Sequence, residues 1–194
     1  PNWIWAKSIG GTGNDLANGV AVDDSSNIYL TGSFESTVDF DPGPNVFNLT
    51  SQGILDVYIL KLDSLGNFLW AVSFGGTGTE SSFGIDVDYA GNVFVTGRFA
   101  DSVDFNPGPG TTMLTSNGDK DVFIVKLSTN GTFIWAKSVG GTGDDEGYAI
   151  SLDNAGFVLI SGAFANTVDF DPNAGTFNLT SNGNWDAFVL KLEN

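Results

Sequence analysis

The sequence WAKSIGGTG at residues 5–13 returns as WAVSFGGTG at 70–78 and as WAKSVGGTG at 135–143. The interval is 65 residues both times, from Trp5 to Trp70 and from Trp70 to Trp135. Other phrases keep this register: DFDPG at 39–43 becomes DFNPG at 104–108 and DFDPN at 169–173. Self-similarity at a fixed period of this length is typical of repeat architectures. The chain therefore consists of three copies of one unit, at about 1–65, 66–130 and 131–194.

Each unit contains four stretches with the pattern of β-strands and no convincing helix. In the first unit they are GVAVD (19–23), NIYLTGSF (27–34), DVYILKL (56–62) and NFLWAVSFG (67–75). The third stretch is apolar on both faces apart from Lys61, as in a sheet stacked between two neighbouring sheets. The connection from 35 to 55 keeps its length in every copy, which favours an ordered loop with an edge strand of its own.

Four antiparallel strands per repeated unit predict an all-β fold made of β-propeller-type blades. Because propellers have about four to eight blades, we expect the three units to be part of a larger propeller or array, or two chains to assemble. The chain opens with a fourth strand (2–10) and finishes with a third (186–192), so the N-terminal strand could complete the last blade of one repeat domain, 1–194. The three repeated tryptophans are expected in equivalent buried places between blades.

The phrases GGTGNDLANGVAVDDSSNIYLTGSF (10–34) and DVYILKLDSLGNFLWA (56–71) resemble the bacterial β-propeller repeat family, the SBBP-type repeats. The resemblance covers almost the whole chain in three passes, although the insert bearing DFDPGP is longer than the usual linker of the family. Repeats of this kind occur in large secreted or cell-surface proteins of the Bacteroidetes type. The resemblance implies a secreted or cell-surface, mostly non-enzymatic module, and it supplies neither a ligand nor a catalytic residue.

Composition excludes several kinds of site and partner. Cysteine and histidine are absent, so the chain has no thiolate nucleophile, disulfide, Cys/His zinc site or Ser-His-Asp arrangement. The net charge of −16 makes nucleic acid and anionic membrane surfaces poor partners and favours cations or basic surfaces. No stretch approaches the roughly 20 apolar residues of a bilayer span, so we expect no membrane insertion.

Paired acidic residues in the DFDPG-type phrases are the candidate metal ligands. In an extended segment the two side chains flanking each phenylalanine project from one face, and carboxylate oxygens so placed suit Ca²⁺. The alternative is a turn, because Asp before Pro-Gly is a common turn starter and one pair falls short of the ~6–8 ligands of calcium. No other cofactor is expected. The candidate ligands are Asp39, Asp41, Asp104, Asn106, Asp169 and Asp171.

The glycine-rich phrases GGTGND (10–15), GGTGTE (75–80) and GGTGDD (140–145) resemble the start of a calcium-binding nonapeptide, but they occur once per unit rather than in tandem. We interpret them as glycine turns in which an acidic residue caps the loop. Trp3 and Trp185 fall outside the repeat pattern and are candidates for exposed recognition. Residues particular to one copy form no recognisable acid/base set: Arg98, Glu35, Glu146, Lys120, Tyr148 and Trp185.

The leading hypothesis is a non-catalytic, secreted or cell-surface β-propeller module that serves as a scaffold or adhesion surface. Its expected partners are other repeats of the same chain, a second copy, or a protein or glycan surface. The alternative is a carbohydrate-binding or glycosidase-like propeller segment whose active residues lie partly outside this sequence. Symmetric acids disfavour that alternative, because glycoside hydrolysis needs two carboxyl groups in different environments. We therefore expect no enzymatic activity.

Overall fold

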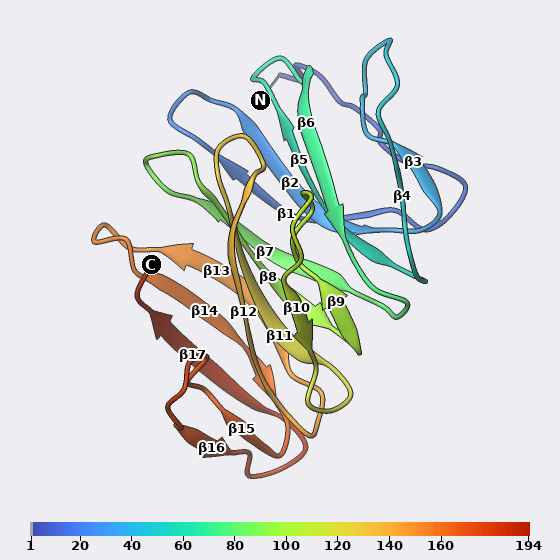
Figure 1. Cartoon of the computed structure of the whole chain (residues 1–194). Helices are drawn as coiled ribbons and strands as arrows, with labels where there is room; N and C mark the ends of the chain where they lie inside the picture. Colours follow the sequence, from blue (N-terminus) through green and yellow to red (C-terminus); the bar gives the residue numbers. More distant parts are fainter. Residues whose placement is uncertain (1) are drawn as a thin grey trace.

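The computed structural model describes residues 2–194 as an array of antiparallel β-sheets (Figure 1). This described range contains strands and turns but no helix, and so no helix long and apolar enough to cross a membrane. Corresponding strands recur from unit to unit, and sequence neighbours pair through tight turns. The first two strands of each unit are β1 (Leu16–Val22) and β2 (Ile28–Phe34), β7 (Ser81–Val87) and β8 (Val93–Phe99), and β13 (Glu146–Leu152) and β14 (Val158–Phe164).

The third and fourth strands follow after a long connection that carries a small hairpin. The third strands are β5 (Asp56–Leu62), β11 (Asp121–Leu127) and β17 (Asp186–Leu192), and the fourth are β6 (Phe68–Phe74) and β12 (Phe133–Gly141). The hairpins are β3 (Thr37–Asp39) with β4 (Asn48–Thr50), β9 (Ser102–Asp104) with β10 (Met113–Thr115), and β15 (Thr167–Asp169) with β16 (Asn178–Thr180). The edge strand expected within 35–55 is therefore present as half of a hairpin.

The three units differ in how many strands their sheets contain. The first sheet has four strands in the order β1-β2-β5-β6. The second has six, because β12 extends past β11 to pair with β15 through Gly140 and Gly141. The third has three, in the order β13-β14-β17. Four strands in every unit, as expected from the repeat, are thus not found in the third sheet.

The N-terminal stretch differs from the expectation most clearly. Residues 2–9 form no strand, and Gly10 makes an isolated bridge to Asp39 in the first unit. The segment therefore lies beside the first unit, and it is not paired with β17. A single strand is stable only when it finds hydrogen-bond partners, and within residues 2–194 this segment has one bridge.

Apolar side chains pack the sheets face against face, with the second sheet in the middle. One cluster joins Tyr29, Val57 and Ile59 of the first sheet to the second sheet, whose Val95 and Phe123 are fully buried. A second cluster joins the opposite face of the second sheet to the third. Strand β5 is buried along its whole length, as its two-faced apolar pattern predicts. Two of the three core clusters therefore join neighbouring units, and the third lies within the first unit, around Phe34, Phe40 and Tyr58.

The innermost strands β1, β7 and β13 approach one another closely. Each carries a register shift at the same repeat position, occupied by Asn18, Phe83 and Tyr148. Such bulges turn a side chain out of the regular alternation. Asn18 uses this to donate a hydrogen bond of 2.9 Å to the Ser82 carbonyl of the next unit. Gly84 has no space for a β-carbon, because the backbone of Ala149 and Ile150 lies against it.

The repeated tryptophans lie at unit junctions, where they are half-buried rather than buried as expected. Trp70 meets Tyr29 edge-to-face at 6.2 Å between ring centroids and donates a 3.0 Å hydrogen bond from Nε1 to the Thr129 carbonyl. Its ring also covers Gly131, in the turn between β11 and β12. Trp70 thus fastens the first sheet to a β-turn of the second.

We predict that Trp70→Ala lowers the free energy of unfolding by about 2–3 kcal/mol, somewhat less than emptying a fully buried aromatic site. The loss combines apolar contact with one hydrogen bond to the Thr129 carbonyl, which would keep the 3.3 Å hydrogen bond from Lys61. Urea denaturation followed by circular dichroism measures it. Trp5→Ala is the matched control: its ring lies against Gly66, and its effect should be smaller. Equal effects of the two substitutions would contradict the role given to the junction.

Candidate functional site

The DFDPG-type phrases connect the two strands of each small hairpin. Phe40 is buried, while Asp39 and Asp41 lie on either side of it in the sequence. Asp39 Oδ1 accepts hydrogen bonds from the backbone N–H of Phe47 at 2.8 Å and of Asp41 at 3.1 Å. Asp41 Oδ1 accepts one from Gly43 at 2.7 Å. One oxygen of each carboxylate is thus a turn cap.

The other two units repeat this arrangement. Asp104 Oδ1 caps Asn106 and Thr112, and Asn106 Oδ1 caps Gly108. Asp169 caps Asp171 and Phe177, and these backbone N–H groups, with Phe177 foremost, hold the pKa of Asp169 below its ordinary value. The structure brings the predicted ligands together in pairs, one pair per hairpin. Within residues 2–194 no three acidic side chains gather in one metal-binding group. Calcium at these loops stays a prediction.

A thermal melt tests the calcium prediction. If the loops bind Ca²⁺, saturating calcium should raise the melting temperature above that in chelator, because a ligand of the native state stabilises it. Asp41→Asn and Asp171→Asn should reduce this shift, and the middle loop, with Asn106, should bind most weakly because it has one negative ligand fewer. Sodium chloride at matched ionic strength controls for screening. Identical curves in calcium and chelator would leave the phrase as a turn.

The glycine-rich loops have an acidic cap in every unit, as their sequence predicts. Asp15, Glu80 and Asp145 accept hydrogen bonds of 2.7–2.8 Å from Gly11, Gly76 and Gly141 respectively. Asp145 also accepts one of 3.0 Å from the Ala165 N–H, after β14. The carboxylates therefore hold the loop against the end of the second strand of their unit.

A second carboxyl group is buried beside this cap at both unit junctions. Isolated parallel bridges, Leu55 with Thr79 and Lys120 with Asp144, place Asp56 next to Glu80 and Asp121 next to Asp145. All four side chains are almost fully buried. Glu80 Oε1 and Asp121 Oδ1 have no hydrogen-bond partner among residues 2–194. Two acids in so little water cannot both ionise cheaply.

The pKa values follow from this burial. Desolvation raises the pKa of Glu80 to about 7, and the charges of Asp56 and Asp101 add to the rise. Desolvation also raises the pKa of Asp121 and of Asp145 to about 6, helped at Asp121 by the charge of Asp145. The pKa of Asp56 is raised for the same reason. The sequence predicted the caps but not these acid pairs. The two acids of each pair are far apart in sequence and become neighbours only through the bridges between units.

We predict that stability falls as pH rises from about 5 to 8. A carboxyl group with a folded pKa above its unfolded value near 4 binds more protons in the folded state, so its stabilising effect is lost as pH passes through the folded pKa. The expected difference is on the order of a few kcal/mol, measured by urea denaturation at both pH values. Glu80→Gln and Asp121→Asn should flatten the dependence, and the exposed Asp119→Asn should not. A stability that rises over this range would contradict the assignment.

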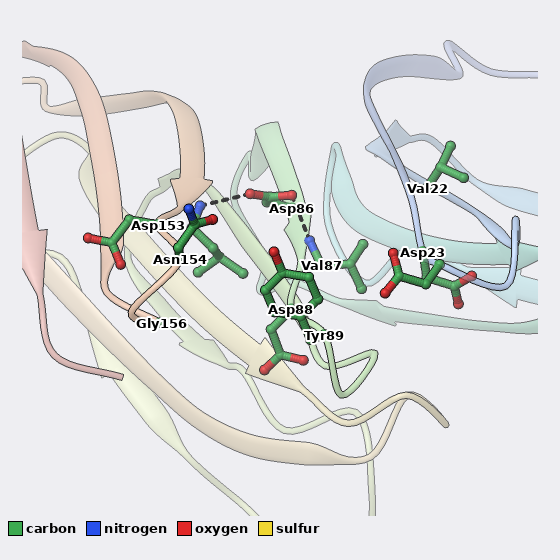
Figure 2. Close-up of a pocket in the computed structure, with 11 residues that line it drawn as sticks. Val22, Asp23, Asp86, Val87, Asp88, Tyr89, Asp153, Asn154 and Gly156 are labelled. Atoms are coloured by element: carbon green, nitrogen blue, oxygen red, sulfur yellow. Dashed lines mark hydrogen bonds between the residues drawn. The ribbon is translucent and has the colours of Figure 1, made fainter.

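The turns of the innermost strands form an acidic pocket of ≈ 220 Å³ (Figure 2). Asp86 lies in its middle and accepts a 2.8 Å hydrogen bond from the Leu152 N–H, which ties the second unit to the third. Asp23, Asp88 and Asp153 cap their own turns, and Asp24 and the exposed Tyr89 complete the wall. None of the eleven residues that line the pocket is basic. Lys61 and Lys191 pair with Asp23 at 3.8 Å and with Asp153 at 2.7 Å, so the negative charge of the pocket is partly balanced.

Several residues that occur in only one of the three repeats lie together at the junction of the second and third sheets. The sequence alone did not predict this cluster. Arg98, the only arginine of the chain, pairs with Glu146, and its guanidinium carbon lies 5.6 Å from the centroid of the Phe83 ring. Tyr148 packs on Phe83 edge-to-face, and burial raises its pKa. Lys120 forms a 3.4 Å ion pair with Asp144 nearby. The available signal was that Arg98 and Glu146 each replace neutral residues of the other units.

Trp3 and Trp185 are both exposed, at 81% and 42%. The placement of Trp3 outside the repeat pattern was wrong: it occupies the repeat position of Phe68 and Phe133, which are half-buried. Trp185 occupies the repeat position of Leu55 and Lys120, so no other unit has a tryptophan there. Neither tryptophan lines the acidic pocket.

Comparison with known proteins agrees with this architecture. Residues 4–33 match the family described as Beta-propeller repeat, SBBP. That match supports the β-propeller repeat family. The chain is also 29% identical, over 96% of its length, to an uncharacterized WD repeat-containing protein of Acanthamoeba polyphaga mimivirus. It is 25% identical, over 66% of its length, to the regulatory protein FlaEY of Caulobacter vibrioides. The chain spans 15% and 13% of these two relatives.

Proposed function

We propose that this chain is a non-catalytic β-propeller-type repeat module that acts as a scaffold and interaction surface in a secreted or cell-surface protein. The observation that supports it most is how the carboxylates are used. They recur at equivalent positions and accept hydrogen bonds from backbone N–H groups in turns and loops, as Asp39, Asp88 and Asp145 do. Groups committed to the backbone in every unit hold the fold and are poorly placed to transfer protons to a substrate.

The glycosidase-like alternative is not favoured by the geometry. Acid catalysis requires a carboxyl group of raised pKa facing a substrate beside an ionised one. The carboxyl groups of raised pKa in this chain, among them Glu80 and Asp121, are fully buried between units, where a sugar ring has no access. In the acidic pocket, desolvation of Asp23 is outweighed by hydrogen bonds from Asn27, Tyr29 and Ser25 together, so the pKa of Asp23 is lowered. A hydrogen bond from Lys191 lowers the pKa of Asp153.

The partner that suits the acidic pocket is a protein segment rich in lysine or arginine. The chain carries a net charge of −16, which attracts a basic partner over a Debye length of about 8 Å in physiological salt. Within the pocket, Asp24 is exposed, and among residues 2–194 its side chain accepts no turn hydrogen bond like the one that Asp23 accepts from Ser25. Its charge can thus be changed with little effect on the turn.

The test is binding of an oligolysine peptide, measured by biolayer interferometry at two salt concentrations. Asp24→Lys should weaken binding several-fold, and the effect should shrink in high salt. Asp119→Lys is the matched control, because it makes the same change of net charge at an exposed site outside the pocket. Equal losses in the two variants would contradict the pocket as the binding surface. Turnover of glycoside substrates by the wild-type chain would contradict the non-catalytic assignment.

A further inference from the structure

Equivalent residues on the outward faces of the first and third sheets are exposed, although they are buried at the inner junctions. Val20 of β1 is 63% exposed, whereas its counterparts Ile85 and Ile150 are each 8% exposed. At the other end, Val189 of β17 is 76% exposed, whereas Ile59 and Ile124 are at 0%. Among the sheets formed by residues 2–194, none lies in front of the first and none behind the third. Both end faces keep the apolar pattern of an inner face.

The N-terminal segment 2–10 occupies part of the position that a preceding sheet would occupy against the first sheet. Gly10 forms a bridge with Asp39 of the first unit. The equivalent glycine of β12, Gly140, pairs in the same way with Asp169 of the third unit. The ring of Trp5 lies against Gly66 as that of Trp70 lies against Gly131. Ile9 packs on the core of the first sheet. The segment thus lies on the first sheet as a fourth strand lies on the sheet that follows it.

What this segment lacks is the third strand beside it. Fourth strands β6 and β12 pair along their length with β5 and β11, whose sequences are DVYILKL and DVFIVKL. Within residues 2–194 one strand of this type has an unpaired edge: β17, with the sequence DAFVLKL, pairs with β14 alone. In the first two units a third strand pairs with a fourth strand. The open edge of β17 and the unpaired segment 2–10 are therefore the two halves of such a pair.

We propose that two copies of this chain associate head to tail, with β17 of each copy pairing to residues 2–10 of the other and the third sheet of one packing on the first sheet of the other. Both ends of each copy are then covered, so the pair closes into a ring of six sheets, within the usual range for propellers. Closure within a single copy is opposed by the second sheet, which separates the first from the third.

The repeat fixes the register of the new pairing. Ile59 faces Val72 and Ile124 faces Lys137, so Val189 should face Lys7 of the second copy. Lys61 faces Trp70 and Lys126 faces Trp135, so Lys191 should face Trp5.

The apolar groove of the first sheet, ≈ 650 Å³ and lined by Trp5, Val20 and Val22 among others, would receive the side chains of the third sheet. Lys191 would be covered as Lys61 is covered by the turn at Thr129.

Charge does not oppose this contact. Residues 2–10 contain Lys7 and no acid, and β17 contains Asp186 and Lys191. The repulsion between two chains of −16 charge is long-ranged and is screened over about 8 Å at physiological ionic strength. Association should therefore strengthen as salt is raised from low to physiological concentration.

The experiment is a disulfide cross-link, which the absence of native cysteine makes clean. Separately purified Lys7→Cys and Val189→Cys chains are mixed and oxidised, so that a bond between the two sites must join two molecules. We expect a species of twice the 20.4 kDa chain mass on non-reducing gels. Ser8→Cys mixed with Val189→Cys is the control: one residue out of register, its side chain points to the other face, and the yield should be several-fold lower.

Sedimentation velocity of the unmodified chain provides the second measurement. A dimer is expected at micromolar concentration, and Val189→Asp should shift it to monomer, whereas Val46→Asp, at a site 70% exposed on a hairpin connection, should not. Unchanged far-UV circular dichroism would show that the variants fold.

A monodisperse wild-type monomer would overturn the proposal, as would cross-linking no better than the out-of-register control. An intrachain bond in the Lys7→Cys/Val189→Cys double variant or an open series of larger species would overturn the closed pair.

Discussion

Burial of each sheet between two neighbours is the constraint on which the rest of this structure depends. The third strand of each unit is apolar on both sides, so both of its faces must be covered. A neighbouring sheet covers one face of β5, and Val38, Phe40 and Ile9 pack with the other. In the second unit β11 has both neighbours, and Val122, Phe123, Ile124 and Val125 are all buried. Stacking of this kind makes the stability of a unit depend on the units beside it, as in other repeat proteins.

Carboxylate side chains hold the turns and loops at the sheet ends by accepting hydrogen bonds from backbone N–H groups. The same side chain does this in each copy: Asp23, Asp88 and Asp153 each accept from backbone N–H groups two and four residues later. At the junctions this device becomes costly, since the cap Glu80 meets a second acid, Asp56, where water is excluded. The acidity of the chain thus has two physical roles, one that closes turns and one that makes the junctions sensitive to protonation.

Much of this fold could be predicted from sequence because its signals are local. The strand 56–62 and the turn before the strand at 68 follow from alternation and from turn residues, and the structure places them within a residue or two. Signals that depend on neighbours could not be predicted. The bulge at Tyr148, the contact of Arg98 with Glu146 and the pairing of Asp121 with Asp145 arise where two units meet. The same holds for the segment 2–10, whose strand-like sequence lacks a strand partner among the described residues.

Comparison of equivalent positions separates what a residue type determines from what its surroundings determine. Ile59, Ile124 and Val189 have almost the same side chain in almost the same strand, yet two of them are fully buried and one is largely exposed. Hydrophobicity alone cannot explain this difference, because it is equal at the three positions. The presence or absence of a following sheet does explain it. Exposure that changes along a repeat while the residue type does not is therefore a physical mark of an unfilled contact, and it identifies the two end faces as the surfaces where this chain has most to gain from a partner.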